Sequence, residues 1–142
     1  MASCSSLDFA VAEQVVPSTT ILVVEDEPLV RLMTADNLRD FGYQVLEASS
    51  GDEAIRLLTA AESRVDIVFS DIQMPGAHDG LAVSRWVRAN RPGMQVLLTS
   101  GNIHAAAGAC PSCHDGAVVA KPYGYPALLR RIRSMHELQS RD

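Results

Sequence analysis

The sequence predicts a single α/β domain in which helices cover both faces of a parallel β-sheet. Short apolar runs rich in β-branched residues alternate with amphipathic segments about five times along the chain. This alternation is typical of parallel sheets with helical crossovers, and right-handed crossovers place helices on both faces. The length of 142 residues fits one domain built around one hydrophobic core.

The expected elements follow from the period of the apolar residues. The predicted strands are Ile21–Val24, Gln44–Ala48, Val65–Ser70, Gln95–Thr99 and Ala117–Ala120. The predicted helices contain Val30 to Phe41, Ala54 to Ala61, Gly80 to Asn90, and Pro126 to Leu138. The second helix is preceded by Ser50-Gly51-Asp52-Glu53, which has the form of a capping box. Between Asn102 and Asp115 the amphipathic signal is weak, so we expect a short or irregular fourth helix, or a loop.

The ends and the charge of the chain limit its class. Residues 1–18 show no clear period, so we interpret them as a mobile extension, 19–139 as the domain and 140–142 as a tail. No apolar run reaches the roughly 20 residues that span a bilayer. The first basic residue is Arg31, so we expect no secretory leader and a cytoplasmic protein. The net charge of −5 argues against nucleic acid as a direct partner.

Chemically active side chains follow four of the predicted strands at their carboxyl ends. They are Glu25 and Asp26 after the first strand, Asp71 after the third, Thr99 on the fourth and Lys121 after the fifth. In open parallel sheets, ligands bind beyond these ends, where the strand order reverses. Crowded carboxylates favour a hard cation such as Mg²⁺. An Asp beside that cation can accept a phosphoryl group covalently, and a Lys and a Thr can satisfy its oxygens.

These motifs resemble the receiver domain of two-component response regulators. The matching residues are Glu25-Asp26 after an apolar strand, Asp71 within Asp-Ile-Gln-Met-Pro-Gly, Thr99, and Lys121-Pro122. The resemblance covers roughly residues 19–139. It implies a flavodoxin-like receiver fold with a doubly wound, five-stranded parallel sheet in the order 2-1-3-4-5.

The resemblance also implies a role for each residue. Asp71 is expected to be the phosphoacceptor, Lys121 to pair with the phosphoryl oxygens, and Thr99 to move toward them. The expected Mg²⁺ ligands are Glu25, Asp26, Asp71 and the backbone carbonyl of Gln73. The implied protein is a bacterial single-domain response regulator that is not itself an enzyme. Its expected partners are a histidine kinase or histidine phosphotransfer protein and an unknown downstream protein, with no membrane partner.

Two positions depart from the family pattern. Receivers often carry an aromatic residue on the fifth strand, three residues before the Lys, and Val118 occupies that position here. Tyr123 is a candidate replacement. Ser100 follows Thr99 directly, and whether it shares the role of that hydroxyl stays open.

Two alternative functions remain at this stage. The cluster Cys110-Pro111-Ser112-Cys113-His114, with His104 nearby, has ligand types that bind zinc or respond to redox state, as in a phosphate-independent adaptor module. The favoured interpretation is a solvent-facing loop, because a second Cys pair is lacking. A haloacid-dehalogenase-like phosphatase also uses Asp, Mg²⁺, Ser/Thr and Lys. Its nucleophile follows the first strand as Asp-x-Asp, where this chain has Glu25-Asp26-Glu27.

Overall fold

A parallel sheet forms the centre of the computed structural model, which describes residues 19–60, 64–100, 118–121 and 124–141. Its strands are β1 (Thr20–Val24), β2 (Gln44–Ala48), β3 (Ile67–Asp71), β4 (Gln95–Ser100) and β5 (Val118–Ala120). Every pairing is parallel, and the order is β2-β1-β3-β4-β5. This order is the one that the resemblance implied.

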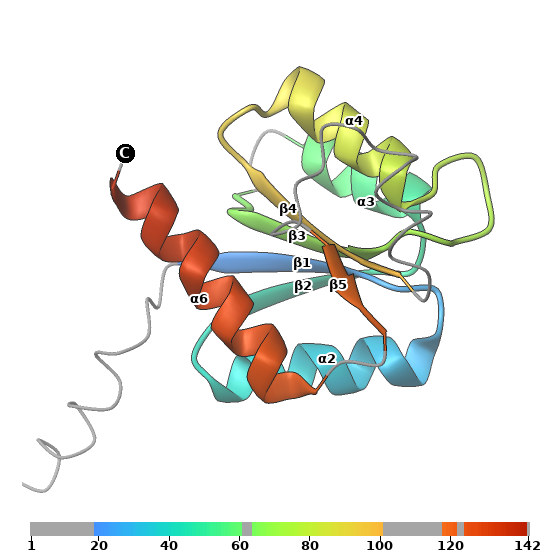
Figure 1. Cartoon of the computed structure of the whole chain (residues 1–142). Coiled ribbons are helices and arrows are strands. Elements are labelled where there is room, and N and C mark those ends of the chain that lie inside the picture. The colour runs from blue at the N-terminus through green and yellow to red at the C-terminus, as the bar shows by residue number, and fades with distance from the viewer. Residues whose placement is uncertain (1–18, 61–63, 101–117, 122–123, 142) are drawn as a thin grey trace, which may run out of the picture.

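Helices cover both faces of the sheet (Figure 1). They are α2 (Pro28–Asp40), α3 (Gly51–Thr59), α4 (Gly80–Asn90) and α6 (Tyr125–Arg141). Helices α2 and α6 pack on one face, and α3 and α4 pack on the other. None of the helices within the described ranges is long and apolar enough to cross a bilayer.

The alternation of side chains along β1 explains why the core has two layers. All five residues of β1 are buried, because neighbouring strands flank it on both edges and helices cover both faces. Ile21 and Val23 belong to the core under α2 and α6, whereas Leu22 and Val24 belong to the core under α3 and α4. Because successive side chains of a strand point to opposite faces of the sheet, one apolar run contributes residues to both hydrophobic layers.

The observed bounds differ slightly from the predicted ones. Strand β3 begins at Ile67 rather than Val65 and ends at Asp71 rather than Ser70. At the start of α3, the Ser50 hydroxyl accepts from the Glu53 amide at 3.1 Å, as a capping box requires. The Glu53 carboxylate, however, accepts from the amide of Ser49 at 2.7 Å, one residue before the N-cap.

Several predictions fall on residues outside the described ranges. They concern the extension 1–18, the irregular helix within 102–115, Tyr123, and the set His104, Cys110, Cys113 and His114. These stay predictions. The backbone of Val118 is described, and it pairs with Leu98 at the start of β5.

The register aligns the carboxyl ends of the central strands. Asp71 at the end of β3 lies opposite Thr99 of β4, and Thr99 lies opposite Val119 of β5. The chain runs from β1 to β2 on one side and then to β3 on the other, so the order reverses at β1. The crevice beyond the ends of β1 and β3 is therefore the expected position of a ligand site.

Candidate functional site

Asp71 and Lys121 form an ion pair at the carboxyl edge of the sheet. The Lys121 Nζ atom lies 2.7 Å from Asp71 Oδ2. The other carboxylate oxygen, Oδ1, accepts from the backbone amide of Gln73 at 3.2 Å. The Lys121 amide donates to the carbonyl of Ser100 at 2.9 Å, which extends the pairing of β4 and β5. Both oxygens of the carboxylate are thus oriented by donors from separate segments of the chain.

Glu25 and Asp26 lie next to Asp71, on the loop that follows β1. One carboxylate oxygen from each of these three residues lies within 4.8 Å of the others. Glu25 and Asp71 are buried, each with an exposed fraction of 7%, whereas Asp26 is exposed. The Glu25 amide donates to the carbonyl of Ala48 at 3.0 Å, which continues the pairing of β1 and β2. The end of the sheet itself therefore fixes the first of the two acidic residues.

The crowding of these carboxylates changes the acidity of Glu25. Burial raises the pKa of Glu25 above its ordinary value, and the neighbouring carboxylate of Asp71 raises it further. The Glu27 amide, 3.2 Å from Glu25 Oε2, and the Lys121 ammonium both lower that pKa, but less than burial raises it. A charged Glu25 is therefore costly without a compensating cation.

The three carboxylates fit a magnesium ion by their chemistry. Mg²⁺ prefers oxygen ligands and keeps several waters, so it usually takes only one or two carboxylates directly. Two buried carboxylates and one exposed carboxylate leave a solvent side for such waters. The residues present can thus hold the ion that the sequence predicted.

Thr99 carries a hydroxyl with unused hydrogen-bonding capacity. Its exposed fraction is 1%, and among the described residues its Oγ1 atom has no hydrogen-bond partner. Buried hydroxyls are nearly always paired, because an unpaired one loses its bonds to water without replacement. The backbone carbonyl of Thr99 accepts from the Ile72 amide at 3.0 Å, which ties this strand to the residue after Asp71.

The loop after Asp71 returns to the sheet at Gly80, a residue that sequence reasoning missed as part of the site. The Gly80 amide donates to the carbonyl of Ile72 at 2.9 Å, and a Cβ atom at Gly80 would collide with the Asp71 carbonyl oxygen. Asp79 caps α4 by accepting from the Ala82 amide at 2.9 Å. The pair Asp79-Gly80, directly before an apolar run, is the sequence pattern that could have predicted this turn.

The structure thus brings together most of the predicted site. Glu25, Asp26, Asp71 and Lys121 converge, and Thr99 lies beside Asp71 in the sheet register. Gln73 touches Asp71 through its amide, and the role of its carbonyl as a ligand stays a prediction. Gln73 also lines an open hollow with Met74, Pro75 and Asp79. Arg31, which binds the carbonyl of Glu25 at 2.9 Å, was missed because no motif includes it.

This fold and this cluster of side chains define a receiver-type signalling domain. The response regulator receiver domain family matches residues 21–133. The chain therefore belongs to the response regulator receiver domain family, whose members act in two-component signal transduction.

Curated relatives are much longer than this chain. The sensor kinase CckA of Brucella abortus is 35% identical over 123 residues, which are 86% of this chain and 13% of that protein. The probable transcriptional regulatory protein TcrX of Mycobacterium tuberculosis is 32% identical over 119 residues, 82% of this chain and 49% of that protein. The chain thus spans about half, or far less, of the length of these relatives.

Two solved structures agree with the fold over nearly their whole length. A response regulator receiver protein from Sinorhizobium medicae has a TM-score of 0.77 at 27% identity, covering 86% of this chain and 97% of that one. The response regulator TrrA from Thermotoga maritima, solved in complex with Mg²⁺-BeF, has a TM-score of 0.71 at 27% identity, covering 82% and 97%.

Proposed function

We propose that the chain works as a phosphorelay receiver in which Asp71 accepts a phosphoryl group in a Mg²⁺-dependent reaction. The observation that carries the proposal is the ion pair between Lys121 and Asp71 next to the carboxylates of Glu25 and Asp26. A nucleophile, an ammonium and a set of oxygen ligands for a cation meet at one point on the carboxyl edge of the sheet. Phosphoryl transfer needs this combination, because the reaction depends on positioning and on neutralising the negative charge of the transferred group.

The transfer step can be written with this chain's own residues. A carboxylate oxygen of Asp71 attacks the phosphorus of a phosphohistidine, an O–P bond forms, and the P–N bond breaks. The electron pair of the broken bond stays on the imidazole nitrogen of the donor. Lys121 holds the carboxylate in place and then faces the phosphoryl oxygens. A magnesium ion on Glu25, Asp26, Asp71 and the Gln73 carbonyl would supply further neutralisation of charge.

Thr99 is the proposed reader of the phosphoryl group. Its buried hydroxyl has no partner among the described residues and can gain a hydrogen bond to a phosphoryl oxygen, and this gain favours a conformation in which Thr99 lies nearer to Asp71. The proposed donor is a histidine kinase or a phosphotransfer protein, and the proposed output is a contact with a downstream protein. The comparisons give no support to the phosphatase or the zinc-adaptor alternative.

Labelling with a phosphohistidine donor or with acetyl phosphate tests the proposal. Wild-type protein should become labelled with Mg²⁺ and not with excess chelator, and Asp71→Asn should lose the label. Asp36→Asn is a matched control, because Asp36 is an exposed carboxylate on the outer side of α2. Full labelling of Asp71→Asn, or labelling that ignores Mg²⁺, would contradict the proposal.

A further inference from the structure

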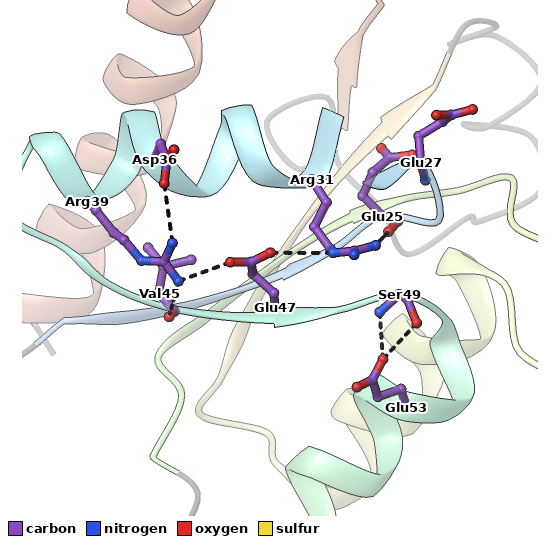
Figure 2. Close-up of polar contacts among 9 residues, drawn as sticks. All are labelled: Glu25, Glu27, Arg31, Asp36, Arg39, Val45, Glu47, Ser49 and Glu53. Atoms are coloured by element: carbon purple, nitrogen blue, oxygen red, sulfur yellow. Dashed lines mark hydrogen bonds and ion pairs between the residues drawn. The ribbon is translucent and has the colours of Figure 1, made fainter. Parts of the chain in front are cut away.

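A chain of polar contacts connects the acidic site to the edge strand β2 (Figure 2). Its central member is Arg31, in the first turn of α2, which joins the backbone of Glu25 to the carboxylate of Glu47. We propose that Arg31 is a positioning residue that sets the orientation of Glu25 and Asp26 for Mg²⁺ binding. This inference rests on the proposed function, since it assigns a purpose to Arg31 at the same site.

The guanidinium of Arg31 makes two contacts with different segments. Its Nη1 atom donates to the carbonyl oxygen of Glu25 at 2.9 Å, and its Nε atom lies 3.4 Å from Glu47 Oε1. The exposed side-chain fractions are 20% for Arg31 and 27% for Glu47, so water competes only partly with these contacts. The planar fork of an Arg can serve both partners at once, whereas a Lys offers a single point of charge.

Glu47 is itself held in place from the other side. Arg39, further along α2, lies 3.1 Å from Glu47 Oε2 and donates to the carbonyl of Val45 at 3.1 Å. The backbone of Glu47 pairs in register with Val23 of β1. The anchor for Arg31 is therefore part of the sheet rather than a free surface carboxylate (Figure 2).

The bond to the Glu25 carbonyl matters because that carbonyl belongs to the peptide unit joining Glu25 to Asp26. The Glu25 amide is fixed by Ala48, and its carbonyl is fixed by Arg31, so both polar backbone atoms of this residue have partners. Rotation of the peptide unit would move the Asp26 side chain relative to Asp71. Arg31 thus restrains the one peptide that connects the two acidic residues.

Arg31 lies where a positive charge is unfavourable, in the first turn of α2 and near the carboxylate cluster. A helix N-terminus carries a partial positive charge, so a cation in the first turn of α2 is disfavoured by local electrostatics. A positive charge near the carboxylate cluster also opposes the binding of a cation there. The charge of Arg31 is thus unfavourable at this position, so the proposed purpose rests on the two contacts that the guanidinium makes.

Loss of the charge and loss of positioning would change the Mg²⁺ affinity in opposite directions. The direction of the change in Arg31→Gln therefore distinguishes the two roles. If Arg31 acted only through its charge, Arg31→Gln would tighten Mg²⁺ binding. If Arg31 positions the acidic pair, the same change should weaken Mg²⁺ binding, by about tenfold for a residue that orients ligands. Calorimetric titration of the unphosphorylated full chain with MgCl₂ measures this directly.

A second readout works without metal. The Glu27 amide donates to the carboxylate of Glu25 at 3.2 Å, so its hydrogen exchange reports whether that carboxylate keeps its orientation. In Arg31→Gln we expect this amide to exchange faster by about fivefold. Arg39→Gln is the matched control, because Arg39 also contacts Glu47 but makes no bond to Glu25. Arg31→Lys keeps the opposing charge and loses the planar fork that serves both partners, so it should weaken Mg²⁺ binding at least as much as Arg31→Gln does.

The outcomes separate this inference from the proposed function. Unchanged exchange of Glu27, tighter Mg²⁺ binding in Arg31→Gln, or an equal effect of Arg39→Gln would each overturn the positioning role. If wild-type protein binds no Mg²⁺, the proposed function fails in its metal requirement, and the exchange rates alone decide the role of Arg31. Thermal unfolding of every variant shows whether the domain stays folded in each measurement.

Discussion

Lys121 and Asp71 form an ion pair of 2.7 Å across β4, which lies between β3, where Asp71 is the last residue, and β5, which Lys121 directly follows. Val119 of β5 lies opposite Thr99, and Thr99 lies opposite Asp71, so the register sets Lys121 just beyond the same edge. The side chain of Lys121 then spans the end of β4 to reach the carboxylate. The pair thus places a cation where the proposed phosphoryl group would arrive, at the end of the strand that carries Thr99.

The first prediction concerns the charge of Lys121. Lys121→Gln should slow phosphoryl transfer to Asp71 by about a hundredfold, the usual effect of losing one preorganised donor to a developing charge. Lys121→Arg should recover little of this loss, since a planar guanidinium cannot occupy the place of a compact ammonium. The initial rate of labelling by a phosphodonor at saturating Mg²⁺ measures both. A rate for Lys121→Gln close to that of wild type would contradict the assignment.

The second prediction concerns the buried hydroxyl of Thr99. Thr99→Val keeps the shape and removes a buried group without a partner among the described residues, so it should raise the free energy of unfolding by about 1 kcal/mol. Thr34→Val is the control, because the Thr34 hydroxyl is equally buried but lies 3.4 Å from the Tyr125 hydroxyl. Urea unfolding of the unphosphorylated protein compares them. A larger loss of stability in Thr99→Val than in Thr34→Val would show that the hydroxyl is paired.

The third prediction is a pH dependence that originates at Glu25. Burial raises the folded-state pKa of Glu25 above its ordinary value of 4.5. The stabilising contribution of the neutral acid is therefore fully present below that value and is lost as the pH rises through the folded-state pKa. In the presence of a chelator, Glu25→Gln should remove this pH-dependent loss of stability. The variant should therefore be more stable than wild type at neutral pH.

Urea unfolding over a pH series checks the effect of Glu25, with Glu27→Gln as the control, since Glu27 is exposed. Added Mg²⁺ should reverse the order, because a ligand that binds the folded state stabilises wild type more than a variant with a weaker site. A wild-type curve parallel to that of Glu25→Gln between acid and neutral pH would exclude the predicted contribution.

The sequence predicts the fold well because the decisive signals are local. Apolar runs at a strand period and amphipathic helices determine the layers, and parallel pairing alone gathers Glu25, Asp71, Thr99 and Lys121 at one edge. The order of the strands came from the resemblance rather than from any pattern of apolar residues. It could not be derived from periodicity, because the period of a strand says nothing about its neighbours.

The supporting contacts of the site could not be predicted in this way. Arg31 reaches Glu47 on another element, and no fixed spacing in the sequence marks such a contact. In a capping box the Glu53 carboxylate would bind the amide of Ser50, but it binds Ser49, which offers two donors, its amide at 2.7 Å and its hydroxyl at 2.8 Å. These details depend on how the side chains meet after folding.

The last prediction concerns Gly80, where α4 begins against the end of β3. A Cβ atom there would collide with the Asp71 carbonyl oxygen and would lie 2.7 Å from the Cα of Ile72, and both obstacles are backbone atoms that cannot rotate away. Gly80→Ala should therefore lower the free energy of unfolding by about 1–3 kcal/mol, as overpacking does. The displaced backbone also belongs to Asp71, so labelling should slow even where the variant is folded.

Gly93→Ala is the control, because a Cβ at Gly93 meets nothing within 4 Å, and it should leave both stability and labelling unchanged. Equal behaviour of the two variants in urea unfolding and in labelling would show that the contact between Gly80 and Asp71 does not constrain the phosphoacceptor.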